Sequence, residues 1–347
     1  PYARHTDGLG GATSSTSKVV IVSRSLREDC DVEFLFGAVS IDQPLIDWSG
    51  NCGNLSAAVG PFALMHGMVP GAPRDGMAQV RIWQANIRKH ITAHVPVAGG
   101  QVVEDGDYQL DGVAFPGAEI RLDFHDPAGA AGMALLPTGR ATEMLEVPGI
   151  GSVPVSCINA GNPTVLVEAA RLGIRGTELP AKLNLQPEFL ARCEAVRAHA
   201  AVRMGLAASA TEATDRRPGT PKLALLSAPA AYLCSDGRNL PADAVDLVVR
   251  MLSMGAVHHA VPGTGAIALA VAAALPGTLA HQLARPTPAG RQTRIGHPSG
   301  LATVAAQVRQ QADGQWHADT ATLSRTARCL MRGEVLVPAR IWDGTVS

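Results

Sequence analysis

The residues best suited to chemistry are a lysine and a cysteine, each set among small and polar residues. Lys18 ends a hydroxyl-rich run, GGATSSTSK (10–18), and Cys52 lies in a turn rich in Gly and Asn, DWSGNCGNL (47–55). An amine can take a proton and a thiol can return one, which is the minimum for general acid–base catalysis. A lysine is mostly protonated at neutral pH, because its ordinary pKa is about 10.4. Lys18 would therefore need burial or a cationic neighbour to act as a base.

The turn that carries the cysteine has the composition of a helix start. Gly50 and Gly53 allow the tightly bent backbone that other residues resist. Asn51 and Asn54 are residue types that cap a helix, and a small-residue helix is predicted over about 54–67. Free N–H groups and the dipole at a helix start attract anions and lower the pKa of a thiol. The pattern predicts a reactive thiol beside a bound carboxylate; the alternative is a capped helix with a buried structural cysteine.

The run that ends at Lys18 is similar to a phosphate-binding P-loop but departs from it. Ser17 stands where that motif requires glycine, and a strand rather than a helix is predicted to follow. What remains is a dense set of hydroxyls and backbone N–H groups ahead of one lysine, which we interpret as a carboxylate cradle. The alternative is an ordinary polar turn. The turns INAGNPT (158–164) and GHPSG (296–300) leave the same two interpretations open.

Several other kinds of active site have no support in the sequence. His258 and His259 are adjacent, and adjacent side chains on a strand point to opposite faces, so a metal site there is disfavoured. The G-x-S-x-G elbow of serine hydrolases is absent. No G-x-G-x-x-G follows a first strand, so dinucleotide binding has no support. We expect neither a metal nor a cofactor.

The composition is that of an ordinary globular protein. The 347 residues carry a formal net charge of −1, and only 4% are aromatic. This balance argues against nucleic acid or an anionic membrane surface as a partner. Six cysteines without a C-x-x-C pair indicate neither a disulfide framework nor a zinc site, so a reducing cytoplasm is the default compartment. The longest apolar run, 266–276, is too short to cross a bilayer.

Short strands punctuated by Gly, Pro and Asp predict an α+β fold with a mostly antiparallel sheet. Two Gly-rich turns each lead into a helix of small residues, over about 54–67 and 264–276. Small side chains allow a sheet to curl tightly around such a helix. We therefore predict two pseudo-equivalent lobes, 1–147 completed by 325–347, and 148–324, each a sheet or barrel around one helix. Facing lobes would bring both helix starts to one cleft, which suits a small polyanion.

Six motifs together resemble those of the PrpF family, the 2-methylaconitate isomerases and related Δ-isomerases. In chain order they are DGLGGATSSTSK (7–18), VSIDQPLIDWSGNCGNLSAAVGPFAL (39–64), VRIWQANI (80–87), INAGNPTV (158–165), LSMGAVHHA (252–260) and GHPSG (296–300). The resemblance spans nearly the whole chain. It implies the diaminopimelate-epimerase-like fold and a cofactor-independent isomerase of small unsaturated tricarboxylates, of the kind that serves propionate catabolism.

The resemblance also implies roles for individual residues. In the family, the lysine of the STSK motif and the cysteine of the NCGN motif are the proposed acid/base groups, which fall on Lys18 and Cys52. Amino-acid epimerases of this fold use two thiols, but the corresponding second turn, PGTG (262–265), has no cysteine, so a lysine–cysteine isomerase fits better. The residues expected to hold the carboxylates are Gly11, Ser14, Ser15, Thr16, Ser17, Ser49, Asn51, Gly53, Asn54, Asn159, Asn162, Met254, Gly263, Thr264, His297 and Ser299.

The resemblance leaves the substrate open. The leading hypothesis is isomerisation of 2-methylaconitate or aconitate, and the enzymatic alternatives are a 4-oxalomesaconate tautomerase and a methylitaconate Δ-isomerase. An alternative of another class is a non-catalytic accessory protein that binds carboxylates. Family members carry an R-G-G-T-S-K segment ahead of the region where this chain begins, so we expect that N-terminal segment to be missing from the sequence. A homodimer stays an open alternative.

Overall fold

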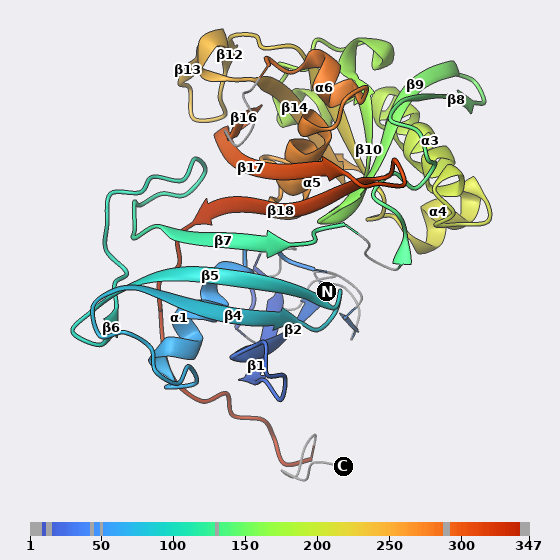
Figure 1. The fold of residues 1–347 in the computed structure, drawn as a ribbon. Coiled ribbons are helices and arrows are strands. Elements are labelled where there is room, and N and C mark those ends of the chain that lie inside the picture. The colour runs from blue at the N-terminus through green and yellow to red at the C-terminus, as the bar shows by residue number, and fades with distance from the viewer. Residues whose placement is uncertain are drawn as a thin grey trace.

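The fold is an α+β arrangement of two lobes built on one long sheet (Figure 1). The computed structural model describes residues 9–11, 16–41, 45–48, 51–128, 132–286 and 292–340. Within these residues, 16 strands join the sheet and two more form a separate pair. The predicted fold class is confirmed.

The first lobe wraps its strands around one helix. Its elements are β1 (Lys18–Arg24), β2 (Val32–Val39), β3 (Ile46–Asp47), α1 (Ser56–Met65), β4 (Gly76–Gln84), β5 (Lys89–Ala98), β6 (Gln101–Val102) and β7 (Ile120–His125). Helix α1 contacts β4, β5, β6 and β7. A Cβ added to Gly60 would lie 2.9 Å from the side chains of Ala93 and Val95. A larger residue would push the helix off the sheet, so glycine permits this close packing.

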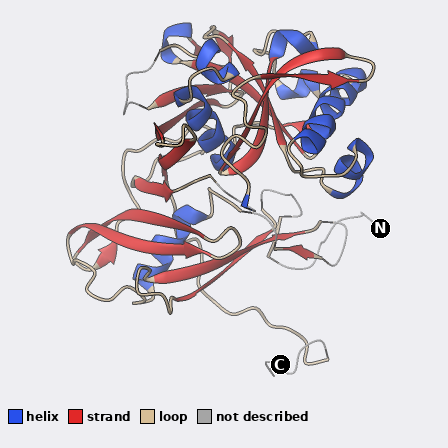
Figure 2. Ribbon diagram, turned by 45° about the vertical axis from the view of Figure 1, so that its right-hand side comes forward, coloured by secondary structure: helices blue, strands red, loops and turns tan. Residues whose placement is uncertain are grey.

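The second lobe repeats the scheme around α5 (Gly263–Ala274), whose residues 263–272 are all buried. Helix α5 contacts β9, β10, β16, β17 and β18, while α3 packs on β8 and β11 (Figure 2). No helix in the described ranges has the length and hydrophobicity needed to cross a membrane. The strands are β8 (Glu143–Val147), β9 (Gly151–Ala160), β10 (Asn162–Glu168), β11 (Lys222–Ser227), β12 (Tyr232–Leu233), β13 (Asn239–Leu240), β14 (Leu247–Ser253), β15 (Ala256–Val257), β16 (Thr293–His297), β17 (Gly300–Gln310) and β18 (Trp316–Arg325). The other helices are α2 (Pro180–Leu183), α3 (Pro187–Arg203), α4 (Ala210–Arg216) and α6 (Leu279–Leu283).

The two lobes share one sheet because β7 pairs with β18. The strand order is β1-β2-β4-β5-β7-β18-β17-β16-β14-β11-β10-β9-β8, and β7 and β18 lie side by side between the lobes (Figure 1). Their antiparallel register sets Leu122 opposite Leu323. Neighbouring strands are antiparallel except in the pairs β2/β4, β10/β11 and β14/β16. The shared sheet fixes the position of α1 relative to α5.

The limits of the lobes stay a prediction. Strand β8 pairs with β9, which places residues 143–147 on the second-lobe side of the sheet. Residues 326–340 form no helix or strand. Within this segment, Ala327 and Arg328 line a hollow together with Ala58 and Phe62 of α1. The chain after β18 therefore runs back to the first lobe.

Candidate active site

The lysine and the cysteine predicted as the acid/base pair lie in contact. Lys18 begins β1, Cys52 lies in the turn before α1, and Nζ of Lys18 donates to Sγ of Cys52 over 3.7 Å. Cys52 is buried, with 8% of its surface exposed. Its carbonyl oxygen accepts hydrogen bonds from the backbone N–H of Ser56 at 3.2 Å and from the Ser56 hydroxyl at 3.0 Å. These bonds tie the cysteine to the first residue of α1.

The loop that carries Cys52 lies against the first turn of α5. A Cβ added to Gly53 would lie 3.3 Å from the backbone nitrogen of Thr264 and 3.4 Å from Cα of Gly263. The starts of α1 and α5 therefore meet, and with them the positive dipole ends of two helices. The N–H groups of Ser56, Ala57 and Ala58 in α1 already bond to carbonyl oxygens of the preceding turn, so the free N–H groups at this junction come from the first turn of α5. Neither helix has an acidic residue in its first turn. The positive potential is not neutralised within the helices, so this junction favours an anion.

Asn51 places a buried amide, without a partner among the described residues, next to Cys52. Its Oδ1 and Nδ2 are both buried, and neither has a hydrogen-bond partner among the described residues. An unsatisfied buried donor or acceptor costs about 1–3 kcal/mol, so native structures pair nearly all of them. A ligand with donor and acceptor atoms would satisfy this amide. Asn51 is therefore a strong candidate for contact with substrate.

Arg325, at the end of β18, adds a buried cation that the sequence analysis did not select. Only 7% of its surface is exposed, and Nε donates to Oδ1 of Asn54 at 3.1 Å. Burial lowers its pKa, an effect that the charges of Tyr108 and Cys52 oppose. A Cβ added to Gly263 would lie 3.3 Å from Nη2 of Arg325, so the guanidinium group reaches the start of α5. Arg325 thus links the Asn54 turn to the second lobe.

The turn between β9 and β10 supplies further polar groups. Nδ2 of Asn162 donates to Oγ1 of Thr264 over 2.8 Å, which ties the turn to the first helical turn of α5. Asn159 is fully buried, and its Nδ2 donates to the carbonyl oxygen of Met133 over 3.0 Å. Asn162 and Thr264 therefore lie together at the helix junction, whereas Asn159 holds the 132–135 segment.

The GHPSG turn is held by its own polar groups. Nδ1 of His297 accepts a hydrogen bond from the backbone N–H of Ser299 at 3.2 Å, and the Ser299 hydroxyl donates to the carbonyl oxygen of His259 at 2.7 Å. His297 is only 3% exposed, and burial lowers its pKa to about 4. The imidazole is therefore neutral at neutral pH. These bonds join the turn to the segment that leads into α5.

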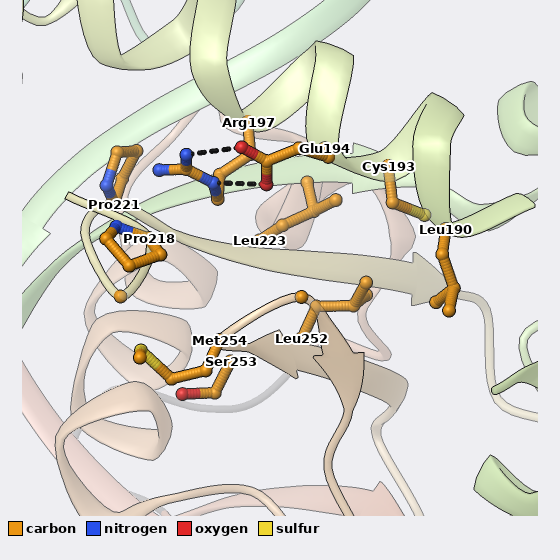
Figure 3. Close-up of a pocket in the computed structure, with 12 residues that line it drawn as sticks. Leu190, Cys193, Glu194, Arg197, Pro218, Pro221, Leu223, Leu252, Ser253 and Met254 are labelled. Carbon is orange, nitrogen blue, oxygen red and sulfur yellow. Dashed lines mark hydrogen bonds and ion pairs between the residues drawn. The ribbon is translucent and has the colours of Figure 1, made fainter. Parts of the chain in front are cut away.

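Met254 lies against the loop around Gly219. A Cβ added to that glycine would lie 3.2 Å from the Met254 sulfur, and the Met254 side chain is 65% exposed. Figure 3 shows Met254 and Ser253 beside a small hollow that the Glu194–Arg197 ion pair also lines. The structure thus places Met254 at this hollow.

The hydroxyl-rich run is described only in part. A Cβ added to Gly11 would lie 2.6 Å from Oγ1 of Thr16, and the carbonyl oxygen of Ser17 accepts from the N–H of Val39 at 3.1 Å. Gly11 and Thr16 therefore lie close together just ahead of Lys18. The remaining predicted residues of the two loops, Ser14, Ser15 and Ser49, lie outside the described residues.

Sequence reasoning missed two further residues whose pKa values burial lowers, Lys222 and His258. Lys222 begins β11, and its Nζ donates to Oγ of Ser253 over 3.0 Å; burial first, and then the charge of Lys18, lowers its pKa. The pKa of His258 is lowered to about 4 by burial and then by His259. The rings of His258 and His259 stack with centroids 4.2 Å apart. The expectation that they point to opposite faces is wrong, because both follow the end of β15 and do not lie on a strand.

Known proteins with similar sequences and structures are isomerases. The PrpF protein family matches residues 1–338. The chain is 51% identical over 343 residues to the 2-methyl-aconitate isomerase of Shewanella oneidensis, covering 97% of this chain and 86% of that protein. It is 38% identical over 338 residues to the 3-methylitaconate isomerase of Eubacterium barkeri, covering 97% and 87%. The crystal structure of a methylitaconate Δ-isomerase superposes with a TM-score of 0.84 at 37% identity, covering 95% of this chain and 84% of that one.

The fold and the similarity to these isomerases define a two-lobed isomerase. Within that class, the chain belongs to the PrpF family. This confirms the family that the sequence motifs indicated. The roles of individual residues stay predictions.

Proposed function

We propose that the protein isomerises 2-methylaconitate, or the related aconitate, by proton transfer and without a cofactor. The observation that carries the proposal is the 3.7 Å contact between Nζ of Lys18 and Sγ of Cys52, beside the starts of α1 and α5. The sequence is closer to the 2-methyl-aconitate isomerase, at 51% identity, than to the 3-methylitaconate isomerase, at 38%. That difference favours a tricarboxylate substrate.

In the proposed mechanism, the neutral amine of Lys18 removes a proton from the carbon γ to a carboxylate. The electron pair of that C–H bond delocalises through the double bond onto the carboxylate as an allylic anion. The Cys52 thiol, or the lysine ammonium just formed, returns a proton at the other end of the anion or after rotation. One acid and one base within hydrogen-bond reach are sufficient for this sequence.

The developing negative charge needs donors that are already in place. The amide hydrogens at the start of α5 supply such donors without reorganisation at the moment of reaction, and the dipole of α1 adds to the positive potential. We assign contact with the substrate carboxylates to the amide of Asn51 and to the start of α5. The Asn162–Thr264 and Arg325–Asn54 hydrogen bonds support the two turns from behind.

Methylitaconate Δ-isomerisation is the second candidate, favoured by the TM-score of 0.84 with a methylitaconate Δ-isomerase. It uses the same proton transfer on a dicarboxylate. We also propose the cytoplasm as the compartment, which fits six cysteines that are all free. Light scattering on the purified protein distinguishes a monomer from the homodimer left open by the sequence.

The substrate is tested by incubation in heavy water with 2-methylaconitate, trans-aconitate, 3-methylitaconate and 4-oxalomesaconate, followed by proton NMR. We expect the fastest deuterium incorporation and isomer formation with 2-methylaconitate. Faster turnover of 3-methylitaconate would support the second candidate. Binding of tricarboxylates without deuterium incorporation into any of them would identify a carboxylate-binding protein and reject the proposal.

A further inference from the structure

Lys222 brings a second lysine close to the site, and the described part of the chain provides no acid for it. Among the described residues, the only lysine in an ion pair is Lys89, with Asp126. The hydrogen bond of Lys222 goes to a neutral hydroxyl, that of Ser253, at 3.0 Å. An ammonium group has three donors, so this bond leaves two for a ligand.

The position of Lys222 in the sheet connects it to the helix junction. Lys222 pairs with Thr164 of β10, the strand that begins at Asn162, and Asn162 bonds to Thr264 at the start of α5. Asn162 and Thr164 are two residues apart on β10 and share a face of the sheet, so Lys222, which is opposite Thr164, lies on the same face as Asn162. An ammonium group at Lys222 without an acid partner is stabilised when an opposite charge joins it. A substrate carboxylate is an anion that can fill this role.

We propose that Lys222 binds one specific carboxylate of the substrate and thereby makes the site select a tricarboxylate over a dicarboxylate without that group. The inference rests on the proposed function in one respect, namely that the substrate is a polycarboxylate. Lys18 already faces Cys52, whereas Lys222 bonds to Ser253. The role of Lys222 is therefore recognition of the substrate and not proton transfer. His258, neutral at neutral pH, adds no charge beside it.

The test is a thermodynamic cycle between the lysine and the carboxylates of the ligand. Mesaconate, glutaconate and itaconate each correspond to aconitate without a different one of its three carboxylates. Dissociation constants for trans-aconitate and for these three dicarboxylates are measured by calorimetry with the wild-type protein and Lys222→Met. A hydrogen bond to a charged group contributes about 1.5–3 kcal/mol, and about 1.4 kcal/mol corresponds to a factor of ten in affinity. Lys222→Met should therefore weaken trans-aconitate binding about 10- to 100-fold.

The cycle identifies the contacted carboxylate. One of the three dicarboxylates lacks the carboxylate that Lys222 binds. For that ligand, Lys222→Met should change the dissociation constant less than about 3-fold, because the interaction is already absent. Lys222→Arg should keep most of the affinity for trans-aconitate. An equal loss for all four ligands, or unchanged binding of trans-aconitate, would overturn the inference.

Two controls separate this result from other causes. Lys182, exposed on α2, loses the same charge in Lys182→Met, which should change no dissociation constant more than about 2-fold. Thermal unfolding of Lys222→Met should match or exceed that of the wild type, because the variant removes an unpaired cation. If Lys222→Met affects the dissociation constants of the ligands unequally as expected, but no substrate exchanges a proton, the proposed function alone is rejected. If substrates exchange protons but the effect of Lys222→Met is the same for all ligands, this inference alone is rejected.

Discussion

At the scale of single residues, the site contains buried polar groups whose hydrogen-bond or charge partners are incomplete among the described residues. Asn51 has an amide without a described partner, and Arg325 is a buried cation bonded to the neutral Asn54. Buried groups of this kind lower stability unless a ligand supplies the missing interaction. Functional sites commonly carry such a cost in the free protein. The amide of Asn51 gives the sharpest test.

We expect Asn51→Leu to weaken binding of trans-aconitate about tenfold, since a hydrogen bond from the protein to a charged ligand is lost. The free protein should be as stable as the wild type or more stable, by up to about 2 kcal/mol, because an unsatisfied buried amide is replaced by apolar atoms of similar size. Urea unfolding and calorimetry measure both effects.

Asn86 provides the matched control. Its Oδ1 accepts from the N–H of Phe36 at 2.9 Å, and its Nδ2 donates to the carbonyl oxygen of Phe36 at 2.8 Å. Asn86→Leu should therefore lower stability by about 1–3 kcal/mol without acting on the ligand through a direct contact. Equal destabilisation by Asn51→Leu and Asn86→Leu would show that Asn51 has a structural role only.

Local motifs predicted part of the site and could not predict the rest. Lys18 and Cys52 each stand in a recognisable run of small and polar residues, so they could be selected without a structure. Lys222 opens a buried strand and Arg325 ends one, and nothing adjacent in the sequence separates them from ordinary strand residues. Their positions depend on how β11 and β18 pair with strands far away in the chain. Such pairing is a property of the tertiary fold.

At the scale of elements, the start of α5 depends on a close approach by the turn between β9 and β10. Gly161 has a φ of +68°, and a Cβ added there would lie 2.6 Å from the carbonyl oxygen of Thr264. Another residue would be strained by the positive φ and would also press on the first turn of α5. Only glycine satisfies both requirements.

We expect Gly161→Ala to destabilise the protein by about 2–4 kcal/mol and to reduce turnover as well, since the first turn of α5 must shift. Gly314→Ala is the matched control. Gly314 has a φ of +81° in the turn between β17 and β18, but nothing lies within 4 Å of an added Cβ. The control should cost only the backbone strain, about 1–2 kcal/mol, with turnover unchanged. Equal effects of both substitutions on unfolding and turnover would contradict the contact.

The two central helices were predictable because their signals are local. Gly-rich turns and runs of small residues indicated helices at about 54–67 and 264–276, and the structure has them at Ser56–Met65 and Gly263–Ala274. The sequence has no local signal for the pairing of β7 with β18, because the residue pattern of either strand would also suit the edge of a sheet. Yet this pairing is what fixes one helix start against the other.

At the scale of the whole molecule, stability should depend on buried neutral histidines. The pKa of His297 is lowered from 6.5 to about 4. Between these values the unfolded chain binds a proton that the folded chain does not, so the free energy of unfolding falls as the pH falls. The full contribution is present above about pH 6.5 and is lost toward pH 4. It amounts to about 3 kcal/mol for a shift of this size.

Urea unfolding at several pH values between 4 and 7 checks this expectation. His297→Asn is a suitable variant, because Oδ1 of asparagine can accept the Ser299 N–H bond without titrating. Its free energy of unfolding should fall less steeply with decreasing pH than that of the wild type. Identical slopes for both proteins would assign the acid sensitivity to other groups, such as His258, whose pKa burial also lowers from 6.5 to about 4.

Proton transfer by the amine of Lys18 is the step on which the proposed function depends. The most direct measurement is deuterium incorporation into 2-methylaconitate in heavy water, followed by proton NMR, for the wild type and for Lys18→Ala. We predict that Lys18→Ala slows incorporation by about 10²- to 10⁴-fold, the usual contribution of a general base, while calorimetry still detects ligand binding. Incorporation by Lys18→Ala at the wild-type rate would contradict the account.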